Sequence, residues 1–330
     1  MQSWILSILN SEKRIALPFM THPGIEIIGK SVKEAVSDGQ VHFQAIKAVS
    51  DLFNTTACTV IMDLTVEAEA FGAGIKLPDN EVPTVFGRLV PDAAAIEDLK
   101  VPTLDKGRVP AYLLASKLAA EYFIDKPVFS GCIGPYSLAG RLYDMSEIMV
   151  AIYIEPESIK LLLSKCTEFL INYCKALKAT GTQGVIIAEP AAGLLSGDDC
   201  LAFSSFYVKQ IVEAVQDDSF TVILHNCGNT GQCTDAMVAT GAHALHFGNA
   251  IDMEEVLKQC PSNVIIMGNL NPVGVFKQGT VESVRQETLH LLQKTAGYKN
   301  FVISSGCDLP PYVPEANILA FLETVDTYNS

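Results

Sequence analysis

Short apolar runs alternate along the chain with longer stretches in which apolar residues recur every three or four positions. Each short run is continuously apolar rather than alternating with polar residues, as is typical of parallel strands that are buried on both faces. We therefore predict a β-strand in each run. The eight runs are residues 15–20, 57–62, 127–132, 184–188, 220–224, 244–247, 263–267 and 300–304.

The clearest helical pattern lies between the third and fourth runs and extends from Glu157 to Ala179. Its apolar residues recur at helical spacing, so they would form one buried face. Gly181 follows as a plausible helix stop. The apolar positions are Ile159, Leu162, Leu163, Cys166, Leu170, Tyr173, Cys174 and Leu177.

Eight strands separated by helical segments predict an α/β fold of the (β/α)8 TIM barrel type. We expect one domain over residues 1–330, with an amphipathic N-terminal helix at 1–14. Residues 64–105 are rich in proline, glycine and acidic residues and lack a strong period. They predict a loop insertion after the second strand, lying over the mouth of the barrel.

Composition narrows the possible functions. The formal net charge of −14, without any run rich in lysine and arginine, argues against nucleic acid as a partner. No apolar stretch approaches the roughly 18 residues of a membrane span, so we expect a soluble protein. Nine cysteines without a secretion signal indicate a reducing compartment, and we expect the cytoplasm.

In a TIM barrel the residues that follow the carboxyl ends of the strands converge on one face, where such enzymes place their chemistry. Polar groups follow most of the predicted strands here, which makes this face the predicted active site. In chain order they are His22, Asp63, the turn GCIGPYS, Glu189, His225 with Cys227, the turn HFGN, the turn GNLNP, and Cys307 with Asp308.

His225, Cys227 and Cys307 form the candidate metal site. Imidazole and thiolate are ligands that zinc prefers, and catalytic zinc sites use three protein ligands and leave one position open. The alternative is a core histidine beside buried free thiols. Cys233 is close in sequence and could be mistaken for a ligand, but it should lie inside the following helix, so Cys227 is preferred. The other cysteines considered, Cys58, Cys166 and Cys174, are expected in the core.

Two carboxylates at strand ends are candidate catalytic residues. Glu189 could be a displaceable fourth ligand, a base, or the acceptor that orients His225, although a plain salt bridge is the alternative. Asp63 holds a similar position, and its alternative role is to fix the loop backbone. His243 and His246 are further histidines that could line the pocket, though each is more often structural.

The glycine-rich turns supply candidate cofactor-binding residues. Tyr136 lies in GCIGPYS and Asn269 in GNLNP, and His22 joins them as a residue that could line the mouth. Backbone N–H groups of these turns could hold an anionic substrate group at helix N-termini. Neither turn is a Walker loop or a dinucleotide fingerprint, so a nucleotide cofactor is not expected.

At these residues the chain resembles the uroporphyrinogen decarboxylase superfamily, and specifically its methylcobamide:coenzyme M methyltransferase branch. The resemblance implies a (β/α)8 barrel, with Zn²⁺ bound by His225, Cys227 and Cys307. It extends from about residue 15 to the C-terminus. The matching segments are MDLTVEAEAFGAGIKLPDNEVPTV, IGPYSLAGRL, EPAAGLLS, HNCGN and GCDLPPYVPEAN.

Departures from the decarboxylase itself disfavour a uroporphyrinogen decarboxylase-like lyase. That enzyme grips substrate carboxylates with an arginine-bearing RQAGR-type motif, whereas the corresponding stretch LPFMTHPG contains no arginine. A tyrosine expected after the GPxxL turn is also replaced, with Arg141 near that place.

The resemblance implies an enzyme that transfers methyl groups between a corrinoid (methylcobamide) and a zinc-activated thiol such as coenzyme M. Coordination to zinc would remove the proton of the substrate thiol and so produce the thiolate, which is the form that attacks the methyl group. Because the chain has no convincing corrinoid-binding motif, a partner corrinoid protein would deliver that group. The alternatives are donor-side transfer from a methoxyl or other methyl donor to cob(I)amide, and a non-enzymatic protein with structural zinc. We make no prediction of oligomeric state.

Overall fold

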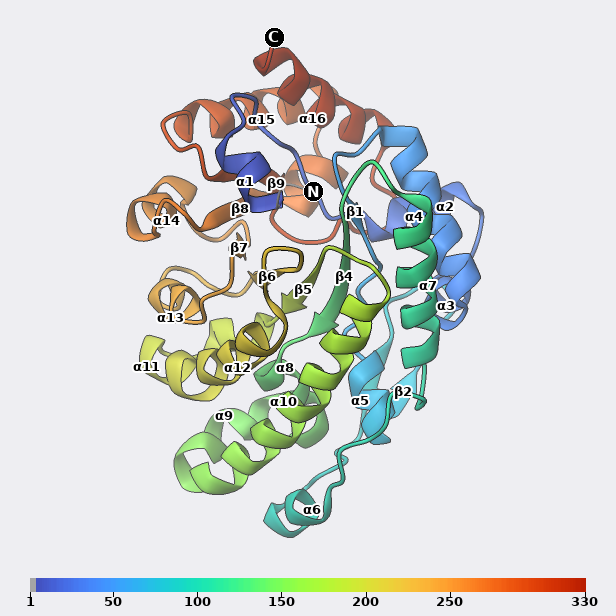
Figure 1. Ribbon diagram of the computed structural model, residues 1–330, viewed down its shortest axis with the longest axis vertical. Coiled ribbons are helices and arrows are strands. Elements are labelled where there is room, and N and C mark those ends of the chain that lie inside the picture. The colour runs from blue at the N-terminus through green and yellow to red at the C-terminus, as the bar shows by residue number, and fades with distance from the viewer. Residues whose placement is uncertain (1–3) are drawn as a thin grey trace.

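The computed structural model describes residues 4–330, and it has the predicted TIM-barrel architecture (Figure 1). A curved sheet of seven parallel strands forms most of the barrel, in the order β1-β4-β5-β6-β7-β8-β9. These strands correspond to seven of the eight predicted runs. They are β1 (Cys58–Thr59), β4 (Val128–Ile133), β5 (Gly184–Ala188), β6 (Thr221–Asn226), β7 (Ala244–Phe247), β8 (Ile265–Leu270) and β9 (Phe301–Ser305).

The remaining predicted strand, residues 15–20, is the first along the chain. It fills the gap between β9 and β1 as an extended segment rather than a full strand. It joins β9 through the parallel bridge of Ala16 with Ile303. On the other side, the hydroxyl of Thr56 donates to the carbonyl of Ala16 at 2.7 Å. Pairing with β9 stops there because serine side chains take the next hydrogen bonds: the Ser304 hydroxyl donates to the carbonyl of Leu17 at 2.6 Å, and the N–H of Phe19 donates to the Ser305 hydroxyl at 3.0 Å.

Helices surround the sheet and cover its outer face (Figure 1). The predicted helix at 157–179 is confirmed as α10 (Pro156–Ala179), and Gly181 follows it with a φ of +95°. The other barrel helices are α2 (Thr21–Ile27), α3 (Val32–Ser37), α4 (Gly39–Phe53), α7 (Val109–Tyr122), α8 (Pro135–Tyr143), α9 (Met145–Ile154), α11 (Gly197–Cys200), α12 (Phe206–Val215), α13 (Thr234–Val238), α14 (Met253–Gln259), α15 (Val281–Lys294) and α16 (Glu315–Tyr328), with the short turns η1 (Pro190–Leu194), η2 (Leu201–Ser205) and η3 (Pro272–Lys277).

The helix predicted at 1–14 is shorter than expected, and its first three residues lie outside the described part of the chain. It is α1 (Trp4–Leu9), whose Ile5 and Ile8 pack with inward-facing strand residues of the barrel. Trp4 contacts Phe129, the second residue of β4, with ring centroids 4.9 Å apart. The helix therefore closes the amino-terminal end of the barrel interior.

The region 64–105 is not the plain loop that its composition predicts. It contains α5 (Val66–Phe71), the hairpin of β2 (Gly74–Lys76) with β3 (Thr84–Phe86), and α6 (Ala93–Asp98). Each piece is too short to produce a clear period in the sequence. Its placement over the mouth of the barrel stays a prediction, although Glu67 of α5 reaches the carboxyl end of β4 by accepting the N–H of Ile133 at 3.0 Å.

The largest hydrophobic cluster draws residues from Ala16 near one end of the chain to Val325 near the other. We infer from this shared core that the described residues form one domain. No helix within residues 4–330 has both the length and the apolar character needed to cross a bilayer.

Candidate metal centre

Three side chains with donor atoms for a metal meet at the carboxyl ends of β6 and β9. His225 is the penultimate residue of β6, Cys227 follows that strand, and Cys307 follows β9. Their donor atoms all lie within 4.8 Å of one another, and the Nε2 of His225 is 3.8 Å from the Sγ of Cys307. The barrel thus brings together two parts of the chain that are far apart in sequence, as the strand-end argument predicts.

One separation within this donor group can be compared with a tetrahedral zinc site. Zinc binds sulfur at about 2.3 Å and nitrogen at about 2.0–2.1 Å, which separates tetrahedral ligands by roughly 3.5–3.8 Å. The 3.8 Å between the Nε2 of His225 and the Sγ of Cys307 lies at the upper end of this range, and all three donor atoms lie within 4.8 Å of one another. His225 is buried, whereas Cys227 and Cys307 are half-buried, so the group is approached from the side of the two thiols.

The two cysteines shift each other's pKa. The neighbouring Cys307 thiol lowers the pKa of Cys227 to about 7 against the opposing effect of burial. The same contact, together with burial, raises the pKa of Cys307. One thiolate is therefore already favoured near neutral pH, which gives the group the negative charge that a divalent cation requires.

His246, which sequence reasoning treats only as a possible pocket residue, is the partner of the metal-site histidine. It pairs in register with His225 on the neighbouring strand, and the two Nδ1 atoms are 2.8 Å apart. Phe19 stacks on the His246 ring at 4.3 Å between centroids. The sequence places each histidine near the end of an apolar run, but the pairing itself depends on the register of the two strands.

Glu189 does not orient His225, contrary to one of its predicted roles. Its carboxylate instead accepts the backbone N–H groups of Tyr136 at 3.0 Å and Ser137 at 2.6 Å, in the first turn of α8. A Cβ atom on Gly134 would lie 2.3 Å from this carboxylate, so only glycine allows the approach. The Glu189 carboxyl group therefore satisfies backbone N–H groups at the N-terminus of α8, and burial raises its pKa to about 7.

Replacing Glu189 with glutamine tests this arrangement. The amide would present an NH2 group to one of the two backbone donors, so we expect the free energy of unfolding to fall by about 1–3 kcal/mol. The measurement is urea denaturation at about pH 5, where the raised pKa leaves Glu189 uncharged in the folded protein, so the cost of burying its charge does not enter the comparison. The exposed Glu157→Gln change in the first turn of α10 is the control, and equal effects of the two changes would contradict the assignment.

The two glycine-rich turns do not offer the free anion site that they predict. The N–H groups at the start of α8 are occupied by Glu189. In the second turn, the Asn271 side chain accepts the N–H groups of Val273 at 3.0 Å and Gly274 at 2.8 Å. In both places the protein's own side chain has taken the position that a substrate anion would use.

The predicted cofactor-binding residues have different surroundings. Tyr136 is fully buried in the core, and within the described residues its hydroxyl makes no hydrogen bond. Asn269 donates to the carbonyls of Gly248 at 2.9 Å and Ile251 at 2.7 Å, which fixes the loop after β7. His22 is buried in α2 and lines a cleft with Tyr312. His22 therefore borders an open cleft, whereas Tyr136 is enclosed by the core.

Two further residues lie apart from the donor group. His243 precedes β7 and is therefore at the amino-terminal end of the barrel, opposite the metal centre. Cys233 lies just before α13 rather than inside it, and its thiol donates to the carbonyl of Ala192 at 3.4 Å. The choice of Cys227 over Cys233 as a metal donor agrees with this geometry.

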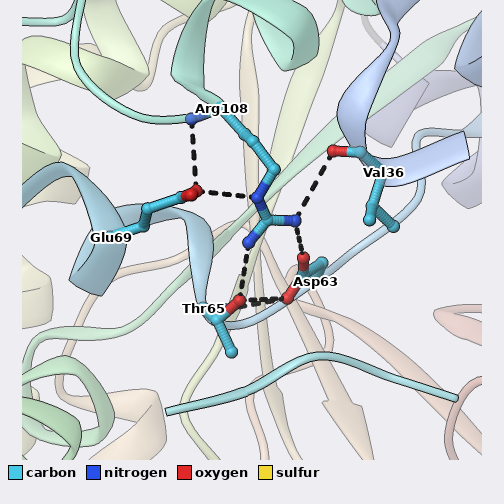
Figure 2. A network of polar contacts seen from close by, with 5 residues as sticks. All are labelled: Val36, Asp63, Thr65, Glu69 and Arg108. Carbon is cyan, nitrogen blue, oxygen red and sulfur yellow. Dashed lines mark hydrogen bonds and ion pairs between the residues drawn. The ribbon is translucent and has the colours of Figure 1, made fainter. Parts of the chain in front are cut away.

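Asp63 belongs to a buried ionic network rather than standing free at its strand end (Figure 2). It accepts the N–H of Thr65 at 3.1 Å and its hydroxyl at 2.7 Å, and it forms an ion pair with Arg108. Arg108 also binds Glu69 at 2.7 Å and the carbonyl of Val36 at 3.5 Å. These contacts support the alternative prediction, that Asp63 fixes the backbone of its loop. Arg108 has no motif that would identify it from sequence.

Glu67 is a second buried carboxyl group near the carboxyl end of β4. One of its oxygens accepts the N–H of Ile133, while the other has no partner within the described residues. Burial raises the pKa of Glu67 to about 7. Its protonated form is therefore favoured in the folded protein over a range in which the unfolded chain is ionised.

Glu67 should make the protein less stable as the pH rises. A carboxyl with a raised folded pKa stabilises the fold below its unfolded pKa, and this contribution is lost as the pH passes through about 7. Between about pH 5 and pH 8 the loss is on the order of 3 kcal/mol. Denaturant unfolding at both pH values should show a smaller decrease for Glu67→Gln than for the unchanged protein, and identical decreases would contradict the assignment.

Comparison with known proteins adds independent information. The sequence profile of the family described as "Uroporphyrinogen decarboxylase (URO-D)" matches residues 14–328. The chain is 30% identical over 317 residues to methylcobamide:CoM methyltransferase MtbA of Methanosarcina acetivorans, which covers 92% of this chain and 89% of that protein. It is 26% identical over 288 residues to uroporphyrinogen decarboxylase of Idiomarina loihiensis, covering 84% and 79% of the two chains.

Solved structures agree on the fold. A methyltransferase from Methanosarcina mazei superimposes with a TM-score of 0.90 at 24% identity, covering 99% of this chain and 98% of that one. A B12-independent methionine synthase from Shewanella sp. W3-18-1 superimposes with a TM-score of 0.61 at 14% identity, covering 96% and 97%.

Proposed function

Because the chain belongs to the uroporphyrinogen decarboxylase (URO-D) family and, within it, to the methylcobamide:coenzyme M methyltransferase-like branch, we propose that it is a zinc-dependent methyltransferase. It moves a methyl group between a methylated corrinoid on a partner protein and a small thiol such as coenzyme M. The observation that carries this proposal is the convergence of His225, Cys227 and Cys307 on one point at the mouth of the barrel.

The donor group fits zinc in the number and type of its donor atoms. His225, Cys227 and Cys307 would hold the ion, and three protein donors leave a tetrahedral position for a substrate. Bound zinc would lower the pKa of a substrate thiol, so that the thiolate is available at neutral pH. The two cysteines would bind as thiolates, and the lowered pKa of Cys227 favours formation of the first of these.

The partner and the compartment follow from the same reasoning. Cys227 and Cys307 are half-buried while His225 is buried, so a corrinoid carried by another protein would approach over the two sulfurs. All nine cysteines are unpaired, which supports a reducing compartment, and we infer the cytoplasm.

A uroporphyrinogen decarboxylase activity is less well supported. The segment that would carry substrate-gripping arginines reads LPFMTHPG, and its Phe19 is buried against His246. This segment therefore contributes an apolar ring beside the donor group, in place of cations that could bind several carboxylates.

The test is a methyl-transfer assay with zinc-loaded protein and methylcobalamin. The acceptors are 2-mercaptoethanesulfonate, 3-mercaptopropionate and 2-mercaptoethanol, and mass spectrometry detects the methyl thioether. A reverse assay supplies cob(I)alamin with methyl ethers and detects methylcobalamin, which would indicate the donor-side reaction. Stoichiometric zinc without transfer in either direction would refute the proposal. X-ray absorption at the zinc edge should show one added sulfur neighbour when the accepted thiol is present.

A further inference from the structure

A chain of hydrogen bonds leads from a backbone carbonyl on one side of the barrel to the candidate metal centre. The Ser304 hydroxyl is 2.6 Å from the carbonyl oxygen of Leu17 and 2.9 Å from the Nε2 of His246. The Nδ1 of His246 is 2.8 Å from the Nδ1 of His225, whose Nε2 faces Cys307 at 3.8 Å. All four residues from Leu17 to His225 are buried, so water does not compete for these contacts.

The positions of the protons follow from this order of partners. A carbonyl oxygen can only accept, so the Ser304 hydroxyl must donate its single hydrogen to Leu17. The serine oxygen can then only accept from His246, which requires a hydrogen on the Nε2 of His246. A neutral His246 with that hydrogen has a bare Nδ1.

The same reasoning extends to the metal-site histidine. Because the Nδ1 of His246 is bare, the hydrogen in the short Nδ1 to Nδ1 contact must come from His225. A neutral His225 that is protonated on Nδ1 has a lone pair on Nε2, the nitrogen directed at Cys307. The opposite tautomer would place a hydrogen where the metal must bind.

Packing holds both rings in the orientation that this chain needs. Strand register places His225 beside His246, and Phe19 lies against both rings. Phe19 stacks on His246 with an interplanar angle of 19° and meets His225 edge-on at 79°. Rotation of either ring would displace Phe19 or break two hydrogen bonds.

We propose that His246 and Ser304 are positioning residues that hold His225 as the Nδ1–H tautomer and so leave its Nε2 free to bind the metal. The tautomer itself is a property of the metal-free protein, whereas its role as a ligand rests on the proposed function. A hydrogen-bonded partner on the second nitrogen of a ligating histidine is a general means of fixing its orientation, and its loss lowers metal affinity about 10–100-fold.

The first experiment measures the tautomers directly in metal-free protein. In long-range ¹H–¹⁵N spectra of histidine-labelled protein, His225 should show a protonated Nδ1 and a bare Nε2. His246 should show a protonated Nε2 and a bare Nδ1. A protonated Nε2 on His225 would overturn the proposal without reference to zinc or activity.

The second experiment measures zinc affinity by competition with a chelator. His246→Leu and Ser304→Ala should each weaken zinc binding about 10–100-fold. His246→Gln should restore much of the affinity, because its amide can accept from His225 and donate to Ser304. Ser130→Ala is the matched control, because this buried hydroxyl on β4 bonds to the Ser116 hydroxyl at 2.9 Å and lies outside the chain of protons.

The outcomes separate this proposal from the proposed function. Unchanged zinc affinity and unchanged His225 tautomer in folded His246→Leu would overturn the positioning role. If the unchanged protein has the expected tautomers but binds no zinc, the tautomer assignment stands and the zinc-dependent function is refuted. Circular dichroism and thermal unfolding of each variant identify any loss of fold.

Discussion

Replacing Cys307 with alanine is expected to reduce bound zinc to well below one ion per chain and to reduce methyl transfer by at least about 100-fold. Loss of a supporting residue around a metal site already costs about 10–100-fold, and loss of a direct ligand removes more. Two donors would remain, His225 and Cys227, which is fewer than a catalytic zinc site uses. Metal analysis by mass spectrometry and the methylcobalamin assay measure the two effects.

A matched cysteine change controls for the loss of a thiol as such. Cys260 lies at the end of α14, away from the donor group, and Cys260→Ala should leave zinc content and transfer unchanged. Full activity with stoichiometric zinc in Cys307→Ala would remove Cys307 from the site. Parallel losses in both variants would indicate a general effect on folding.

Replacing Arg108 with methionine is expected to cause the largest loss of stability, about 3–5 kcal/mol. The change removes the cation that binds Asp63 and Glu69, and Asp63 is almost fully buried. An unpaired buried carboxylate is strongly destabilising, even where the complete ion pair contributes little. Urea denaturation at neutral pH measures the change in the free energy of unfolding.

An exposed arginine provides the comparison. Arg285 pairs with Glu323 on the surface, and Arg285→Met should cost at most about 1 kcal/mol. In the double variant Arg108→Met with Asp63→Asn, much of the loss should be recovered, because the uncompensated charge is gone. Equal effects of the Arg108 and Arg285 changes would show that the buried network contributes no more than a surface pair.

Much of the fold could be predicted from the sequence because strands that are buried on both faces leave a simple pattern. Runs such as 184–188 and 220–224 coincide with strands almost to the residue. The run at 15–20 could not be distinguished from the others, since its single bridge depends on serine side chains that take the hydrogen bonds of Leu17 and Phe19. The elements within 64–105 are too short to leave a readable period.

The candidate site could be predicted for those residues that have both a metal-binding side chain and a place at the carboxyl end of a strand. His225, Cys227 and Cys307 combine both, and the barrel geometry brings them together. The predicted anion-binding turns are wrong for a physical reason: Glu189 and Asn271 fill them from within the chain. Which carboxylate or amide reaches a given N–H group depends on packing between separate elements, and no local pattern records it.

The role of His246 could not be predicted because it depends on the register of β6 with β7, which the sequence alone does not specify. Two histidines at the ends of consecutive strands become partners only when those strands are neighbours with the same alignment. Ser304 and Phe19, which are far apart in sequence, both contact His246. They meet there only because the segment at 15–20 closes the barrel next to β9.

That closure has a consequence for how the protein matures during synthesis. Leu17 and Phe19 support a centre whose other half includes Ser304 and Cys307, so the centre cannot exist on a nascent chain that lacks β9. At translation rates of about 5–20 residues per second, about 15–60 s pass between the synthesis of Leu17 and that of Ser304. Any metal bound by the proposed centre is therefore captured only after β9 has been synthesised.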